Sequence, residues 1–334
     1  MKFNASHPSV RLTGRWDTSK EGIAQTTNSG SYIDLAFEGR MVTLLFDTYE
    51  NATPALHLWV SVDGGASMEV PIDNYLKIKA AYDGRHTVRI IYKGGAEVAS
   101  RWFAPLHGKV TFLGFVADGA SEMPEDNRRV IEVVGDSITE GVLVDYDYKE
   151  YAHFRYDIEQ QNFPYSTDAC ATYAWLTAEK LDLRPCIMGF GAVGVTRGGQ
   201  GRVPAATQAY PYNYDGSPIT RKKPDIVVLN HGTNDTRSNV PNFLEKYELM
   251  LDIIREHNPE AVVVSLSPFS GKHHEVLGTL IKDYNERKGA NVYFVDTFGW
   301  ISPEPLHPLR DGHKTVADNF APILEKIIKE NFKD

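Results

Sequence analysis

Apolar and polar residues alternate along the first part of the chain with the two-residue period that is typical of half-buried β-strands. Five stretches show this pattern, at residues 31–37, 41–46, 56–62, 86–92 and 109–115. Turn-forming sequences lie between them, namely Asp63-Gly64-Gly65, Asp83-Gly84 and Lys93-Gly94-Gly95. Short strands at this spacing, with no helical pattern between them, predict a jelly-roll-like β-sandwich over residues 1–118.

A polar segment at residues 119–129 is interpreted as a linker, because the pattern changes after it. Near-continuous apolar runs then predict buried parallel strands at 130–134, 185–190, 225–229, 261–266 and 291–295. Apolar residues spaced by three or four predict helices that include residues 243–254, 276–284 and 317–328. The expected fold class is therefore α/β, with a five-stranded, doubly wound parallel sheet over residues 130–334.

The first of these strands ends in Gly135-Asp136-Ser137, which places a hydroxyl group at the carboxyl end of the sheet. Open α/β sheets bind their ligands at that edge. A serine there can act as a nucleophile if a base takes its proton and if donors hold the oxyanion that forms. The loops that follow the other strands are where we expect these partners.

His307 is the candidate base, because it lies after the fifth strand and before the last helix. Glu304, three residues earlier, could orient the imidazole as the acid of a triad does. The alternatives are a solvated loop histidine, a solvated Glu304, and a backbone carbonyl as the orienting group.

Three groups are candidate donors to the oxyanion. They are the backbone N–H of Ser137, a glycine N–H after the second strand, from Gly191 or Gly194, and the side-chain amide of Asn234 after the third strand. The glycines could equally serve only the turn. Each position alone is weak evidence for an oxyanion hole, but all of them fall at the same edge of the predicted sheet.

Composition narrows the classes of function. The 42% apolar and 24% charged content is typical of a soluble globular protein, and a net charge of −9 argues against a nucleic-acid or membrane partner. No secretory signal or membrane span is recognised, so we expect a cytoplasmic location. The only cysteines are Cys170 and Cys186, and the usual metal-binding motifs are missing, so neither a metal nor a cofactor is expected.

Four segments resemble, in order, the sequence blocks of the SGNH (GDSL) hydrolase superfamily. They are Gly135-Asp136-Ser137-Ile138-Thr139, Gly194-Val195-Thr196, Gly232-Thr233-Asn234-Asp235 and Glu304-x-x-His307-Pro308. The resemblance implies a flavodoxin-like sheet, Ser137 as nucleophile, His307 as base, and an oxyanion hole completed by Gly194 and Asn234. The family usually has Asp at the position of Glu304.

A β-sandwich ahead of such a domain, with Gly14-Arg15-Trp16-Asp17, is similar to carbohydrate esterase family 2. Members of that family remove acetyl groups from plant polysaccharides and sugars, and some use a Ser–His dyad oriented by a main-chain carbonyl. The resemblance implies a serine esterase that deacetylates xylo- or manno-oligosaccharides through an acetyl-enzyme. Two alternatives stay open: another short-chain acyl hydrolase of lipase or thioesterase type, and a glycan-binding protein with a vestigial site.

Two further features lie close to the expected site in the sequence. Trp300 could stack on a sugar ring, although a packing role is as good an interpretation. Residues 142–168 leave directly from the serine turn without a clean period. They could form one wall of the site or a long surface excursion.

Overall fold

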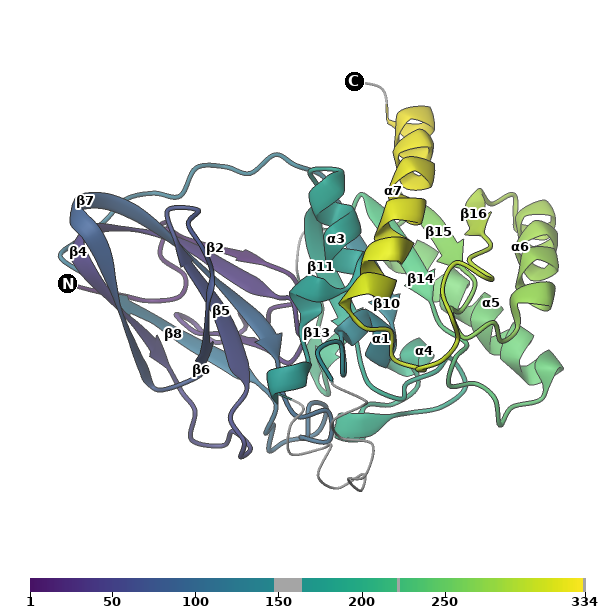
Figure 1. Cartoon of the computed structure of the whole chain (residues 1–334), viewed down its shortest axis with the longest axis horizontal. Helices are drawn as coiled ribbons and strands as arrows, with labels where there is room; N and C mark the ends of the chain where they lie inside the picture. The colour runs from purple at the N-terminus through teal and green to yellow at the C-terminus, as the bar shows by residue number, and fades with distance from the viewer. Residues whose placement is uncertain (147–163, 221–222, 333–334) are drawn as a thin grey trace.

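The computed structural model describes residues 1–146, 164–220 and 223–332. An antiparallel sheet from the first part of the chain lies beside a parallel sheet from the second part, along the long axis of the molecule (Figure 1). The predicted fold class is confirmed.

The antiparallel sheet has nine strands. Its main path runs β1-β8-β4-β7-β5-β6, while β2 and β9 pair with β4 and β3 pairs with β8. The strands are β1 (Lys2–Phe3), β2 (Val10–Thr13), β3 (Ala24–Thr26), β4 (Tyr32–Phe46), β5 (His57–Val62), β6 (Met68–Pro71), β7 (Tyr75–Gly94), β8 (Val110–Val116) and β9 (Gly119–Ala120).

The long strands β4 and β7 differ from the prediction. The two strands expected at 31–37 and 41–46 form one strand with a register shift between Gly39 and Met41. Because of that bulge, the core-facing side chains change from odd to even positions, and both halves of β4 face the same core. The turn predicted at Asp83-Gly84 was wrong, because Gly84 pairs with Gly39 inside the ladder.

The parallel sheet has the order β11-β10-β14-β15-β16, which is the flavodoxin-like arrangement. Its strands are β10 (Val130–Gly135), β11 (Arg184–Gly189), β14 (Ile226–Asn230), β15 (Val262–Leu266) and β16 (Val292–Val295). Gly135 lies opposite both Gly189 and Asn230, so the carboxyl ends of the first three strands are level. The loops that leave these strands therefore meet.

Helices cover both faces of the parallel sheet. One face packs on α3 (Tyr173–Lys180) and α7 (Arg310–Asn331), and the other on α5 (Val240–His257) and α6 (His274–Lys288). Shorter elements are α1 (Ser137–Glu140), η1 (Ala169–Ala171), η2 (Gln200–Arg202), α4 (Ala206–Ala209), β12 (Tyr212–Tyr214) and β13 (Ser217–Pro218). Among the helices of the described ranges, none is both long enough and apolar enough to cross a bilayer.

A buried ion pair connects the two sheets. The Nε atom of Arg15, from the Gly-Arg-Trp-Asp sequence, donates to Oε1 of Glu132 in β10 at 3.0 Å, and both side chains are fully buried. Tyr32 of β4 also packs in one cluster with Ile131 and Trp175. The antiparallel sheet ends at Ala120 and the parallel sheet begins at Val130. The division into 1–118, a 119–129 linker and 130–334 stays a prediction, and β9 extends the antiparallel sheet two residues into the predicted linker.

Candidate active site

Ser137 lies at the carboxyl end of β10, where the chain turns directly into α1. The Asp136 carboxylate caps this helix by accepting the Ile138 N–H at 3.0 Å. A Cβ on Gly135 would lie 2.1 Å from Oγ1 of Thr139, so the turn is tight enough to require glycine there. The hydroxyl group is consequently held at a fixed position on the sheet edge.

His307 reaches Ser137 from the loop between β16 and α7. Its Nε2 atom lies 2.9 Å from Oγ of Ser137, within hydrogen-bonding distance. Burial lowers the pKa of His307 to about 4, so the imidazole is neutral at neutral pH. A neutral Nε2 at this distance is able to accept the hydroxyl proton.

The structure does not bring the Glu304 carboxylate to His307. Glu304 is exposed, and its contacts within the described residues are backbone contacts, with its carbonyl accepting from Oγ of Ser302 at 2.7 Å. No described residue, whether acid or carbonyl, is hydrogen bonded to Nδ1 of His307. The role of Glu304 stays a prediction.

Asn234, just after β14, lies beside the serine turn. Its Nδ2 atom donates to Oδ2 of Asp136 at 3.3 Å and to the Val193 carbonyl at 3.1 Å. Both neighbours are acceptors, so the nitrogen of the amide, rather than its oxygen, faces the turn. Burial and the nearby Asp235 charge together raise the pKa of Asp136 to about 7, although the Ile138 N–H acts in the opposite direction.

The two candidate glycines of the loop after β11 both have acceptors in this structure. The Gly194 N–H donates to the Arg197 carbonyl at 3.0 Å, and the Gly191 N–H donates to Oε2 of Glu140 at 2.9 Å. The Ser137 N–H, by contrast, has no acceptor among the described residues. The Gly194 N–H can donate to an oxyanion only after its hydrogen bond to the Arg197 carbonyl breaks.

Asp235 attaches the loop after β11 to the end of β14. Its fully buried carboxylate accepts from the backbone N–H groups of Val195 and Thr196, at 3.3 and 2.8 Å, and from Oγ1 of Thr196 at 2.6 Å. The sequence pattern contains this residue within Gly-Thr-Asn-Asp, but nothing in the spacing indicates which loop it holds.

Arg101 supports the same loop from the first half of the chain. Its buried guanidinium contacts the Glu140 carboxylate through both terminal nitrogens, and that carboxylate accepts the Gly191 N–H. Glu97 lies against Gly191, and burial together with the Glu140 charge raises the pKa of Glu97 to about 7. Sequence periodicity gave no indication of this cluster.

Trp300 and His313 lie outside the Ser137–His307 contact. Trp300 is half-buried and packs against the cluster beneath α3 and α7. His313, in the first turn of α7, is buried and accepts the Tyr173 N–H at 3.1 Å. The greater part of the 142–168 segment, residues 147–163, lies outside the described residues.

This fold, with its Ser137–His307 pair at the sheet edge, is that of a carboxylic ester hydrolase. The family model described as GDSL-like lipase/acylhydrolase matches residues 133–315, and the chain belongs to that family. The model described as carbohydrate esterase 2 N-terminal matches residues 12–125. The resemblance inferred from the sequence motifs is thereby confirmed.

Solved structures extend the likeness over almost the whole chain. A family two carbohydrate esterase from Cellvibrio japonicus has a TM-score of 0.80 at 20% identity, with 98% of each chain covered. The acetyl xylan esterase Est2A from Butyrivibrio proteoclasticus has a TM-score of 0.75 at 20% identity, covering 97% of this chain and 96% of its own. The salicylyl-acyltransferase SsfX3 from a tetracycline biosynthetic pathway has a TM-score of 0.65 at 15% identity, with 98% of both chains covered.

With sequence identities of 15–20%, the similarity to these structures establishes the fold of the chain. No curated protein matches the chain.

Proposed function

We propose that the protein is a serine esterase that removes O-acetyl groups from acetylated xylo- or manno-oligosaccharides. The observation that carries the proposal is the 2.9 Å contact between Oγ of Ser137 and Nε2 of a neutral His307. Membership of the GDSL-like family and the match of residues 12–125 to the carbohydrate esterase 2 N-terminal domain support the substrate class.

The reaction begins when Oγ of Ser137 attacks the acetyl carbonyl carbon and His307 takes the hydroxyl proton. The carbonyl oxygen becomes an oxyanion, which accepts from the Ser137 N–H, and from Nδ2 of Asn234 once one of its two N–H groups turns away from Asp136 or the Val193 carbonyl. Asp136 and the Val193 carbonyl hold the Asn234 amide in the donating orientation. The Gly194 N–H is the third predicted donor, once the turn to Arg197 opens.

Collapse of the tetrahedral intermediate transfers the proton from His307 to the leaving sugar hydroxyl and leaves an acetyl group on Ser137. Water then attacks this acetyl-enzyme while His307 takes its proton, and His307 returns that proton to Oγ of Ser137 as the acyl bond breaks and acetate leaves. Because the Glu304 carboxylate has no contact with His307, the base works in this proposal as one member of a Ser–His dyad.

The test is acetate release from acetylated xylo-oligosaccharides by the wild type, by Ser137→Ala and by Ser19→Ala as a matched surface control. We expect Ser137→Ala to lose at least about 10³-fold in kcat, since removal of a serine nucleophile costs about 10⁶-fold elsewhere. Ser19 is exposed in the β-sandwich, so its variant should keep wild-type activity. A wild type that releases no acetate, or a fully active Ser137→Ala, would overturn the proposal.

The same assay on Glu304→Ala distinguishes a dyad from a triad. An exposed carboxylate without contact to the base should leave kcat within about threefold of wild type. Loss of a true triad acid costs about 10⁴-fold, and a fall of that size would make Glu304 the third catalytic group.

A further inference from the structure

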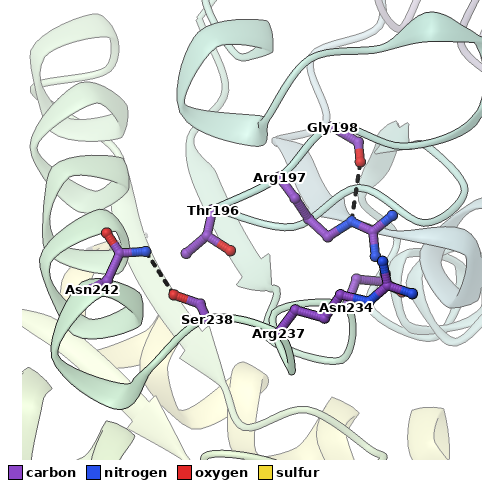
Figure 2. A pocket seen from close by; sticks show the side chains of 7 residues that line it. All are labelled: Thr196, Arg197, Gly198, Asn234, Arg237, Ser238 and Asn242. Atoms are coloured by element: carbon purple, nitrogen blue, oxygen red, sulfur yellow. Dashed lines mark hydrogen bonds between the residues drawn. The ribbon is translucent and has the colours of Figure 1, made fainter.

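A polar cavity of about 500 Å³ opens beside Asn234. Its described lining, drawn in Figure 2, consists of Thr196, Arg197, Gly198, Asn234, Arg237, Ser238 and Asn242. Asn234 belongs both to this cavity and to the serine site, because its amide donates to Asp136 next to Ser137. Neither Ser137 nor His307 is among the described lining residues, so Asn234 is the residue through which the cavity adjoins the serine site.

Two arginines line the cavity, and neither has a carboxylate partner in the part of the chain that the structure describes. Figure 2 shows the Arg197 and Arg237 side chains reaching toward each other. Arg197 donates to the Gly198 carbonyl at 3.2 Å, and neither guanidinium forms an ion pair with any described residue. Elsewhere in the described part of the chain, carboxylates pair with Arg11, Arg15, Arg89, Arg101, Arg128, Arg287 and Arg310.

No described residue of the lining neutralises this positive charge. The other described lining groups are neutral, and Asn242 already donates to Oγ of Ser238 at 2.6 Å. The nearby Asp235 carboxylate is buried and is occupied by three donors of Val195 and Thr196. The N-terminal end of α5, at Val240, adds a partial positive charge on the same side.

We propose that this cavity binds a carboxylate of the substrate, so that the preferred substrate is an acetylated acidic oligosaccharide carrying a uronic acid next to the acetylated sugar. The inference rests on the proposed esterase function. Two guanidinium groups match a planar carboxylate better than they match a neutral sugar hydroxyl. The volume is within the range of about 300–1,000 Å³ found for small-molecule sites, which suits one sugar unit.

Calorimetric binding to Ser137→Ala tests the proposal without requiring turnover. The ligands are xylotriose and xylotriose carrying one glucuronic acid. We expect the acidic ligand to bind about five- to tenfold more tightly at low salt, and the advantage to shrink as salt is added. Arg197→Gln and Arg237→Gln, each in the Ser137→Ala background, should each remove most of the advantage.

Arg40→Gln in the same background is the matched control, because Arg40 is an exposed arginine of the β-sandwich and its loss changes the net charge equally. Equal affinity for the two ligands, or a preference that survives Arg197→Gln and Arg237→Gln together, would overturn the proposal. Tighter binding of a sulfated xylotriose than of the uronic acid would also overturn it, since the site would then be one for sulfate.

The binding experiment and the acetate assay separate the two proposals. If the wild type releases no acetate but Ser137→Ala still prefers the acidic ligand, the esterase proposal fails and the carboxylate site stands. If acetate is released at equal kcat/KM from acidic and neutral acetylated substrates, the esterase proposal stands and the carboxylate site fails.

Discussion

His307 is an unusual base because burial keeps it neutral while no described carboxylate contacts it. In a triad, the acid stabilises the imidazolium that forms during the reaction. Here the imidazolium must be stabilised by the developing negative charge on the substrate and by solvent. Because the pKa of His307 is low, the imidazole is neutral and able to act as a base over a wide pH range.

The pH dependence of kcat/KM follows from this pKa. Only neutral His307 accepts the Ser137 proton, so activity is present above its pKa and is lost as the pH falls through about 4. Initial rates on p-nitrophenyl acetate between pH 3.5 and 8 measure the acidic limb. A midpoint near the ordinary histidine value of about 6.5 would contradict the expectation.

Asp136 is a second group near Ser137 whose titration affects the pH profile, and a variant at this position separates its limb from that of His307. Its pKa is raised to about 7, so protonation of Asp136 could produce a second limb at higher pH. Asp136→Asn removes this titration and keeps an oxygen that can accept the Ile138 N–H, but it loses the second oxygen that accepts from Asn234, so the comparison uses the positions of the limbs and not the absolute rate. A limb near 7 that is present in the wild type and missing in Asp136→Asn belongs to Asp136, and the limb near 4 should remain.

Residue positions in the site were predictable to different degrees. Ser137 and His307 follow buried strands of a parallel sheet, and the rule that such strands end at one edge was enough to bring them together. Glu304 was chosen from its spacing to His307. Spacing does not determine side-chain direction in a loop, and Glu304 points to solvent.

At the scale of elements, the site depends on a loop tied to a strand end. The ends of β10, β11 and β14 are level, so the loop after β11 begins at the same edge of the sheet as the loops after β10 and β14. Asp235 after β14 holds this loop through Val195 and Thr196. A Cβ on Gly194 would lie 2.5 Å from Oδ1 of Asp235, so the contact also requires glycine.

Asp235→Asn should therefore lower activity through the loop. The amide keeps the volume but removes one acceptor oxygen, and we expect kcat to fall about 10–100-fold with little change in KM, as for other orienting groups. Steady-state kinetics on p-nitrophenyl acetate give both constants. Asp215→Asn, at an exposed aspartate with no side-chain contact to described residues, is the matched control. A loss below twofold would mean that the loop holds its shape without Asp235.

Periodicity predicted the parallel strands and the three long helices because each buries one continuous face. It failed at β4, where a bulge joins two predicted strands into one, and at β7, where the turn predicted at Asp83-Gly84 is part of the strand. A bulge depends on pairing with a distant strand, here Gly39 with Gly84, and local alternation contains no information on that pairing.

At the scale of the whole molecule, the two halves share buried charges. Arg15 pairs with Glu132, and Arg101 pairs with Glu140 beneath the Gly191 N–H. Sequence periodicity assigns neither arginine a buried position, although Arg15 belongs to the Gly-Arg-Trp-Asp motif. Their burial results from contacts more than thirty residues away, as with the 39 positions between Arg101 and Glu140, and so was not predictable.

Arg101→Met should destabilise the protein strongly. It leaves Glu140 buried without its cation and next to Glu97, and breaking one partner of a buried pair costs about 3–5 kcal/mol. Chemical denaturation measures the free energy of unfolding. Glu140→Gln added to Arg101→Met should restore part of the loss, while Arg40→Met on the sandwich surface should have no effect. A loss below about 1 kcal/mol in Arg101→Met would contradict this account.

Arg101 also bears on how such a protein can change over generations. A binding module joined to an enzyme only by a linker can be exchanged for another without harm to the reaction. Here the β-sandwich supplies a cation beneath the loop that surrounds the serine. Recombination at residues 119–129 would separate Arg101 from Glu140, so the two halves must be inherited together, and a new sugar specificity has to arise by substitution within both of them.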